Sequence, residues 1–379
     1  MTVLFCALGI YSSVGGMQRF NERVVTCLGE LRDTFITSAS ILVLWDSRHD
    51  QQKVPPGVCF LPCGRCKLRM LLRFVWTIVR RRPDVILYGH TLLTPLAVIA
   101  HFLAPHIRQL VFVHGVEAWD EPRLFERKIV SRYIHRIVSV SRFTALRMLQ
   151  AYRLDCSRFT VLPNAIDLPE KEHGRLGMAR LKGKDRLLTV SRLDDRYKGH
   201  DKVISSLKNV LPLYPETHYY VVGHGPLAEE LRMQAEADGV ALNVHFLGCL
   251  DDRTLNAVYE SCDIFVMPSK GEGFGIVFLE AWKHRMPVIA GNQDASGEVI
   301  QHDVSGLLVN PDSTEEIGSA ILTLLSDPKR GIALGEAGYR SLRKKYTQAH
   351  FKERLSEALM SMAGVENQAG RGCGTKAPC

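Results

Sequence analysis

Apolar segments of four to six residues recur along the whole chain and alternate with longer stretches of helical periodicity. Strands that are apolar at nearly every position are typical of parallel sheets covered by crossover helices. We expect such strands at residues 3–8, 41–44, 85–88, 110–113, 137–140, 186–190, 218–222, 243–246, 263–267, 288–290 and 307–309. The pattern therefore predicts an α/β protein built from doubly wound sheets.

The polar stretch 168–184, which contains Pro, Gly, Lys and Glu, separates two groups of strands. Because 379 residues are too many for one ordinary core, two domains are expected. We predict an N-terminal Rossmann-like domain at 1–167, a linker at 168–184 and a C-terminal Rossmann-like domain at 185–345, facing each other across a cleft. A helix at 346–362 is a candidate for return to the first domain, and 363–379 is predicted to be a disordered tail.

The apolar runs are too short to span a bilayer, which needs roughly 20 residues. The longest, 92–104, is interrupted by Pro95 and His101. No Lys or Arg precedes the first apolar run, which disfavours a secretory signal. We therefore expect a cytoplasmic protein.

The net charge of +8 is concentrated in the first part of the chain. Residues 1–160 contain 22 Lys and Arg against 11 Asp and Glu, whereas the remainder contains 26 against 29. A basic N-terminal part favours an anionic partner, either nucleic acid or a membrane surface. No zinc-finger spacing, RNP-like aromatic strand or basic leucine zipper is present, so the membrane surface is preferred and no nucleic acid is expected.

The segment from Lys67 to Arg82 combines basic residues with one apolar helical face. That face consists of Leu68, Leu71, Leu72, Val75 and Val79. One interpretation is peripheral docking to anionic lipids at the inner face of the cell membrane. The other is an ordinary packing helix with a basic rim, and the sequence leaves both open.

Ten cysteines in a cytoplasmic chain are most simply reduced thiols. Cys59, Cys63 and Cys66 have a C-x3-C-x2-C spacing that could hold an iron–sulfur cluster. The alternative is three unrelated cysteines at a strand end and in the following loop. We prefer the alternative, because the strands and helices of the chain do not predict the single barrel that would surround such a cluster.

The segment 268–281 is the most informative for function. A buried strand ends at Met267, a glycine-rich loop follows, and a helix begins near Ile276. Exposed amides at a helix N-terminus favour a phosphate, and glycines let the backbone approach it closely. Two carboxylates, Glu272 and Glu280, lie at either end, on the order of 10 Å apart at the helical rise. Each carboxylate could therefore hold one end of a nucleotide sugar.

Glu272-x7-Glu280 with Gly273-Phe274-Gly275 between them resembles the E-x7-E signature of retaining GT-B glycosyltransferases, especially glycosyltransferase family 4. Further segments resemble this family in consistent order over residues 1–360. They are Gly15-Gly16, His114-Gly115-Val116-Glu117, Pro163 to Asp167, Ser191-Arg192-Leu193, Tyr197 to His200, and Val222 to Leu227 with Gly223.

The resemblance implies a GT-B fold, with an acceptor-binding domain at 1–167 and a nucleotide-sugar-binding domain at 185–345, and it assigns roles to individual residues. Arg192 and Lys198 would neutralise the leaving diphosphate, Arg as a planar fork and Lys as a point charge. With Glu272 and His114 they form the expected catalytic set. The donor-binding set implied is Gly15, Gly16, Arg192, Lys198, Gly223, Glu272, Gly273, Phe274, Gly275, Ile276 and Glu280. A simple loop or core histidine at His114, and turn glycines at Gly15 and Gly16, remain alternatives.

The chain departs from the family pattern after the Glu280 helix. Arg285 stands where the family usually has a glycine, which would favour the left-handed turn that ends a helix, and this leaves the local geometry open. No D-x-D motif occurs, so nothing in the sequence requires a divalent metal, and we expect no cofactor.

The resemblance is greatest to bacterial exopolysaccharide mannosyltransferases. It implies a retaining hexosyltransferase that moves mannose from GDP-mannose to a saccharide acceptor, which could be linked to polyprenyl diphosphate. UDP-glucose and UDP-N-acetylglucosamine are the next candidate donors. A nucleotide-sugar 2-epimerase of the same fold and a non-catalytic nucleotide-sugar-binding subunit are the alternatives. Glu272, Glu280, Arg192 and Lys198 are all present, which argues against the non-catalytic subunit.

Overall fold

The computed structural model describes residues 1–12, 15–32, 34–168 and 181–363, which form two compact units. Unit 1 is Met1–Asn164 together with the C-terminal helix from Gln348, and unit 2 is Ala165–Thr347. Most of the predicted linker and almost all of the predicted tail lie outside the described residues.

Unit 1 contains a parallel sheet of seven strands in the order β3-β2-β1-β4-β5-β6-β7. The strands are β1 (Thr2–Ala7), β2 (Ser38–Val43), β3 (Cys59–Pro62), β4 (Val85–Tyr88), β5 (Arg108–Val113), β6 (Arg136–Ser139) and β7 (Phe159–Val161). The side chains of Val3 to Ala7 are wholly buried, as expected for a central strand covered on both faces. Because the chain leaves β1 towards β2 on one side and continues at β4 on the other, the switch point of this sheet lies between β1 and β4.

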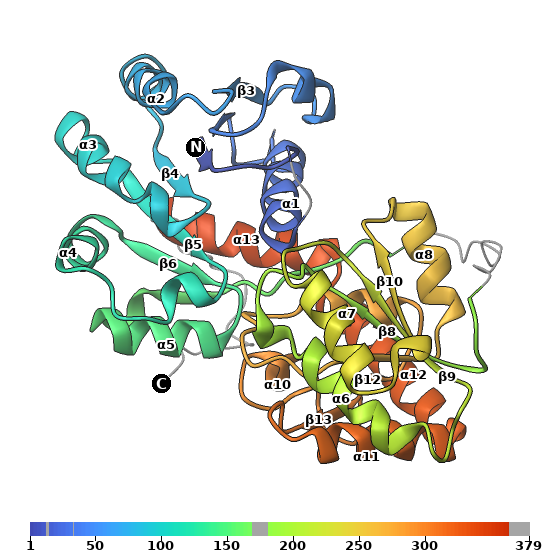
Figure 1. Cartoon of the computed structure of the whole chain (residues 1–379). Helices are drawn as coiled ribbons and strands as arrows, with labels where there is room; N and C mark the ends of the chain where they lie inside the picture. Colours follow the sequence, from blue (N-terminus) through green and yellow to red (C-terminus); the bar gives the residue numbers. More distant parts are fainter. Residues whose placement is uncertain (13–14, 33, 169–180, 364–379) are drawn as a thin grey trace. The chain divides into compact units, whose positions relative to one another are not determined.

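The helices of unit 1 are α1 (Gly16–Glu30), α2 (Lys67–Arg81), α3 (Pro95–Leu103), α4 (Leu124–Tyr133), α5 (Arg142–Tyr152) and α13 (Gln348–Ala363). Helix α13 lies beside α1 although some 330 residues separate them in the chain (Figure 1). The rings of Phe20 and Phe351 meet edge to face with centroids 5.2 Å apart, and Arg23 Nη1 donates to Gln348 Oε1 over 2.9 Å. These contacts place the C-terminal helix in unit 1.

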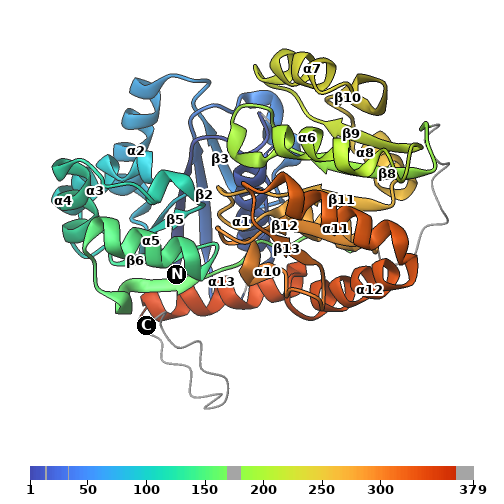
Figure 2. The same ribbon diagram turned by 60° about the horizontal axis from the view of Figure 1, so that its bottom comes forward.

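Unit 2 contains a parallel sheet of six strands in the order β10-β9-β8-β11-β12-β13. The strands are β8 (Asp185–Val190), β9 (Thr217–Val222), β10 (Val244–Gly248), β11 (Ile264–Met267), β12 (Val288–Gly291) and β13 (Leu307–Val309). The helices are α6 (His200–Val210), α7 (Ala228–Ala237), α8 (Asp252–Ser261), α9 (Ile276–Lys283), α10 (Ser296–Val299), α11 (Thr314–Ser326) and α12 (Pro328–Lys345). Helix α11 packs on β12 and β13 beside α6 (Figure 2). Here the switch point lies between β8 and β11.

All eleven predicted strands overlap observed ones, and the α/β class with two Rossmann-like sheets is confirmed. Strands β3 and β7 were not predicted. Both are edge strands with partly exposed side chains, so neither needs the continuous apolar run that marks a buried strand. Among the described residues no helix is both long and apolar enough to cross a membrane.

The turn after α9 keeps the left-handed backbone although it lacks the glycine of the family pattern. Arg285 has φ 57°, a region that costs a residue with a β-carbon roughly 1–2 kcal/mol. Its guanidinium pairs with Glu336 over 2.7 Å and lies 4.4 Å from the ring centroid of Tyr339. Both partners belong to α12, so side-chain contacts with that helix offset the backbone cost.

Gly335 of α12 lets that helix approach the Arg285 turn. A β-carbon at Gly335 would lie 1.9 Å from the carbonyl oxygen of Arg285, whereas one at Gly331 in the same helix would meet Pro287 Cγ at an ordinary 3.6 Å. We expect Gly335→Ala to cost about 1–3 kcal/mol by overpacking and to lower the melting temperature by roughly 5 °C. Gly331→Ala is the matched control and should leave the melting temperature unchanged or raise it. Equal melting temperatures for the two variants would contradict this packing.

Candidate active site

The carboxyl ends of β8 and β11, at the switch point of unit 2, carry an ion pair between Lys198 and Glu272. This is where ligands bind in open parallel sheets. Lys198 ends the short helix Arg196–Lys198 that follows β8, and Glu272 lies in the loop after β11. Both side chains are largely buried, at 15% and 12% exposure. Burial opposes the ammonium charge, but the adjacent Glu272 carboxylate outweighs it and raises the pKa of Lys198.

Tyr197 holds the two loops together. Its carbonyl oxygen accepts from the amide of Lys270 over 2.9 Å, and its ring lies 4.8 Å from the Lys198 ammonium. A β-carbon at Gly271 would lie 2.4 Å from that ring, so only glycine allows this approach. The glycine-rich loop is therefore shaped by packing against Tyr197 as well as by any ligand.

Asp294 fixes the backbone of Glu272 from the other side. Its Oδ2 accepts from the Glu272 amide over 2.7 Å, its Oδ1 accepts from the Ser296 amide over 2.9 Å, and the Glu272 carbonyl accepts from the Ala295 amide over 3.1 Å. Burial raises the pKa of Asp294 to about 6, although these amides favour the carboxylate. Sequence reasoning missed Asp294, because it follows β12 in a segment without a recognised motif.

Helix α9 begins directly after the glycine-rich loop. Gly275 is its N-cap with φ 82°, which explains glycine at this position, and Ile276 is its first residue. Phe274 is buried and meets Tyr346 edge to face at 5.6 Å, while Gly273 is also buried. This stretch can therefore contact a ligand through the backbone amides at the start of α9.

Glu280 lies further along α9, where Oε2 accepts from the Tyr259 hydroxyl over 3.1 Å. The two acids of the E-x7-E pattern therefore have different partners, a lysine for Glu272 and a tyrosine hydroxyl for Glu280. This difference is consistent with separate roles for the two carboxylates.

Arg192 lies just after β8, and its guanidinium pairs with Asp194 over 3.0 Å at 68% exposure. It is not part of the Lys198–Glu272 pair, although its positive charge opposes the rise in the pKa of Lys198. A β-carbon at Gly223 would lie 1.8 Å from the Ser191 carbonyl oxygen, and Gly223 has φ 141°. Glycine at this position therefore lets the β9 turn close on the Arg192 segment.

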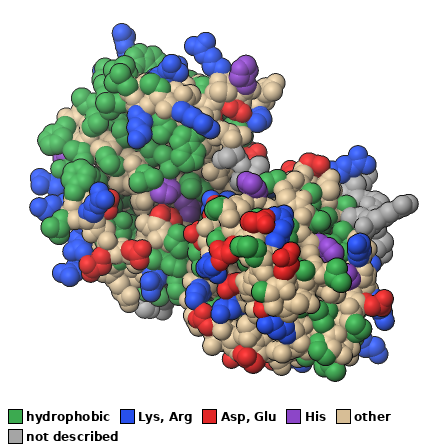
Figure 3. Space-filling model, viewed as in Figure 1, with side chains coloured by type: hydrophobic (Ala, Val, Ile, Leu, Met, Phe, Trp, Pro, Cys, Tyr) green, Lys and Arg blue, Asp and Glu red, His purple; other side chains and the backbone are tan. Residues whose placement is uncertain are grey.

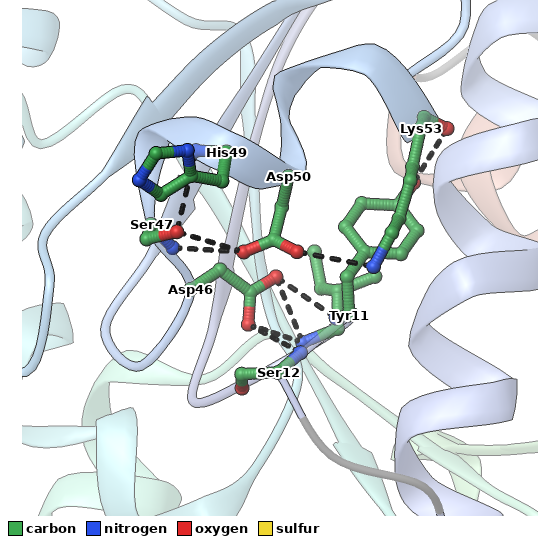
Figure 4. Close-up of polar contacts among 8 residues, drawn as sticks. Tyr11, Ser12, Asp46, Ser47, His49, Asp50 and Lys53 are labelled. Atoms are coloured by element: carbon green, nitrogen blue, oxygen red, sulfur yellow. Dashed lines mark hydrogen bonds and ion pairs between the residues drawn. The ribbon is translucent and has the colours of Figure 1, made fainter.

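The predicted residues of unit 1 lie beyond β1 and β5. Gly15 is the extended N-cap of α1 and Gly16 its first residue. The loop before them is held by Asp46, a wholly buried residue beyond β2, whose carboxylate accepts from the amides of Ile10, Tyr11 and Ser12 over 2.9–3.2 Å (Figure 4). Sequence reasoning missed Asp46, although an aspartate two residues after the predicted strand 41–44 was an available signal.

His114 directly follows β5 and is partly buried. Its Nε2–H donates to the Gly89 carbonyl over 2.9 Å, its backbone amide donates to Glu117, and its ring meets Phe20 at 4.9 Å. Burial lowers the pKa of His114, so the imidazole is neutral near pH 7. His90, which sequence reasoning missed, follows β4; its Nδ1 accepts from the Leu92 amide over 3.0 Å, and burial lowers its pKa as well.

The three clustered cysteines have separate local contacts. Cys59 lies in β3, Cys63 Sγ donates to the Leu61 carbonyl over 3.7 Å, and Cys66 Sγ accepts from the Arg69 amide at the start of α2. Within the part of the chain that the structure describes, no three His, Cys, Asp or Glu side chains are grouped to hold a metal ion.

The raised pKa of Asp294 makes the free energy of unfolding depend on pH. Between the ordinary Asp pKa and about 6 the folded chain keeps a proton that the unfolded chain has released, so the free energy of unfolding falls as pH rises through that window. We expect Asp294→Asn to remove this contribution, so that the stability difference between wild type and variant changes by up to about 3 kcal/mol between pH 4 and pH 7. Urea denaturation across this range measures it, and two parallel pH profiles would contradict the assignment.

Comparison with known proteins accounts for both units. The family model described as Glycosyltransferase Family 4 matches residues 14–170, and the model described as Glycosyl transferases group 1 matches residues 178–341. The two models thus match segments of both units.

Curated relatives are similar over much of the chain. A GDP-mannose-dependent alpha-(1-6)-phosphatidylinositol monomannoside mannosyltransferase of Mycobacterium tuberculosis is 32% identical over 262 residues, covering 64% of this chain and 68% of that protein. A GDP-mannose-dependent monoacylated alpha-(1-6)-phosphatidylinositol monomannoside mannosyltransferase of Corynebacterium glutamicum is 33% identical over 178 residues, covering 45% and 46%.

Among solved structures, HepE of Anabaena, determined in complex with UDP-glucose, superimposes with a TM-score of 0.78. The match covers 95% of this chain and all of HepE at 20% identity, so it bears on the fold alone. Together with the family models and the mannosyltransferase relatives, it shows that this chain is a GT-B glycosyltransferase of glycosyltransferase family 4.

Proposed function

We propose that the enzyme transfers mannose, with retention of configuration, from GDP-mannose to a lipid-linked saccharide. The observation that carries the proposal is the buried Lys198–Glu272 pair at the start of the loop leading into α9, a cation beside a helix N-terminus. The relatives named above use GDP-mannose and act on phosphatidylinositol mannosides, which supports mannose as the sugar and a glycolipid as the acceptor class. A polyprenyl-diphosphate-linked acceptor belongs to the same class.

Charge development explains the proposed roles. When the anomeric C–O bond breaks, the sugar becomes oxocarbenium-like and negative charge collects on the leaving diphosphate. Lys198, Arg192 and the amides at the start of α9 would stabilise that charge, and fixed donors of this kind usually contribute more to catalysis than any other single effect. These groups can neutralise a diphosphate without a divalent ion, so we propose that transfer needs no metal.

Retention follows if the acceptor attacks from the face that the diphosphate leaves. The acceptor hydroxyl forms the new bond to the anomeric carbon, and its proton passes to a diphosphate oxygen, so no protein base is needed. In this scheme Glu272 holds Lys198 in place and Glu280 contacts the nucleotide end of the donor. His114, as a neutral imidazole, would contact the transferred sugar.

We also propose that unit 1 docks on an anionic membrane, which would bring the enzyme to a lipid-linked acceptor. Helix α2 turns Met70, Phe74 and Ile78 into the core, and the predicted apolar face lies on the opposite side. Three helices of unit 1 leave large apolar side chains exposed: Leu68, Leu72, Trp76 and Val79 of α2, Phe102 and Leu103 of α3, and Leu124 and Phe125 of α4.

Basic residues accompany this exposed surface. Helix α2 contains five Lys and Arg residues and no acidic residue, and α3 lies between α2 and α4. Figure 3 shows apolar and basic side chains gathered over this part of unit 1. An apolar face with flanking bases is typical of helices that lie in the interface of an anionic bilayer.

The charge-stabilising roles predict specific losses of turnover. We expect Arg192→Ala and Lys198→Ala each to lower kcat about 10²–10³-fold with GDP-mannose and a mannoside acceptor, because each removes one donor aimed at the leaving group. Lys329→Ala, an exposed lysine of α12, is the control and should behave as wild type.

The same assay separates the alternatives. GDP-, UDP- and ADP-sugars are compared as donors, NMR of the product reports the anomeric configuration, and donor incubated alone reports epimerisation. Near-normal turnover in both variants would overturn the site assignment. An inverted linkage would overturn retention, and a different donor would overturn mannose.

The membrane proposal predicts lipid-dependent binding. We expect flotation with vesicles of phosphatidylcholine and phosphatidylglycerol, weaker flotation with phosphatidylcholine alone, and an at least tenfold loss of binding for the double variant Leu72→Ser/Trp76→Ser. Leu213→Ser/Leu242→Ser removes two exposed leucines of unit 2 and is the matched control. Binding that ignores anionic lipid, or is equal for both double variants, would contradict the docking surface.

A further inference from the structure

A chain of hydrogen-bonded side chains crosses the interior of unit 2. Ser191 Oγ lies 2.7 Å from His200 Nε2, His200 Nδ1 lies 3.1 Å from the Tyr219 hydroxyl, and the Tyr219 hydroxyl donates to Thr189 Oγ1 over 2.8 Å. Thr189 Oγ1 in turn donates to the carbonyl oxygen of Val266. Thr189 and Tyr219 are wholly buried, and His200 is 3% exposed.

The direction of every proton in this chain is fixed by its inner end. A carbonyl oxygen can only accept, so Thr189 gives its proton to Val266 and accepts from Tyr219. Tyr219 has then used its only proton, so His200 must carry a proton on Nδ1 and donate it. The remaining Nε2 can only accept, so the Ser191 hydroxyl proton points to it over 2.7 Å, although Ser191 Oγ also lies 3.1 Å from the carbonyl oxygen of Arg192. Burial, and then the charge of Lys198, lower the pKa of His200 to about 3, so this neutral tautomer persists at physiological pH.

Each end of the chain adjoins a segment of the candidate site. Ser191 immediately precedes Arg192, and His200 follows Lys198 by two residues. The intervening Gly199 has φ 79°, and a β-carbon there would lie 2.6 Å from the Pro268 carbonyl oxygen. Val266 lies in β11, the strand that leads into the Glu272 loop. The chain thus joins the backbones that carry Arg192, Lys198 and Glu272.

We propose that His200 is a positioning residue, which uses the buried chain to Tyr219 and Thr189 to hold the Arg192 and Lys198 segments in register with the Glu272 loop. This rests on the proposed function, because it assigns the chain a role in orienting the groups that stabilise the diphosphate. His200 acts through Lys198 and need not touch the substrate. A displacement of about 1 Å at such groups can cost on the order of a hundredfold in rate.

The test breaks the chain at its buried end, far from any ligand. We expect Tyr219→Phe and Thr189→Val each to lower kcat about tenfold or more with the KM for the donor nearly unchanged, because the displaced charges of Arg192 and Lys198 act mainly on the negative charge that develops in the transition state. Tyr220→Phe is the matched control. Its hydroxyl, on the next residue of β9, donates to the Lys182 carbonyl over 2.9 Å and lies outside the chain. Melting temperatures are measured in parallel.

A second readout separates positioning from a general loss of structure. In a Lys198→Ala background, Tyr219→Phe should cost less activity than it does in the wild type, since part of the effect passes through Lys198. Equal kcat for Tyr219→Phe and Tyr220→Phe, or full additivity with Lys198→Ala, would overturn the proposal. Imidazole ¹⁵N shifts of His200 should show the Nδ1–H tautomer in the wild type, whether or not GDP-mannose is the donor. The opposite tautomer would overturn the chain itself, while absence of any sugar transfer would overturn only the proposed function.

Discussion

The ion pair between Lys198 and Glu272 is the contact on which the rest of the candidate site depends. It joins two loops 74 residues apart in sequence, and it places two opposite charges where little water reaches them. Removing one partner of such a pair leaves an uncompensated buried charge, at a cost of several kcal/mol. The surrounding features keep the pair together: the Tyr197 carbonyl bonds one loop to the other, Gly271 clears the tyrosine ring, and Asp294 holds the Glu272 amide.

The sequence predicted those features of the site that a short continuous stretch of residues encodes. Glycines at 271 and 275, and the acids at 272 and 280, follow a buried strand in a pattern that already indicates a loop opening a helix. By contrast, Asp46 and Asp294 become informative only when the fold brings distant amides to their carboxylates. The same holds for His200 at the start of α6, whose role depends on Tyr219 in β9. Spacing along the chain cannot reveal partners that tertiary packing supplies.

For the fold as well, the sequence predicted some elements and missed others. Central strands such as β1 must be apolar throughout, and the sequence predicted all of them. Strands β3 and β7 each pair on one side only, so their apolar runs are weaker and they were not predicted. Arg285 shows why a departure from a family pattern need not change geometry: the strained turn is kept, and Glu336 and Tyr339 of a neighbouring helix supply the compensating contacts. The glycine usual in this turn is absent, and contacts with α12 stabilise the turn instead.

The return of α13 to unit 1 has a consequence for the order of assembly during synthesis. Unit 2 is an insertion within unit 1, and its two ends are tied where the Ile166 amide donates to the Tyr346 carbonyl over 3.0 Å. The ribosome therefore releases every residue of unit 2 before Phe351, which covers Phe20 of α1. Until α13 emerges, the face of α1 that it covers stays open to water, so unit 1 begins to form before unit 2 and is completed after it.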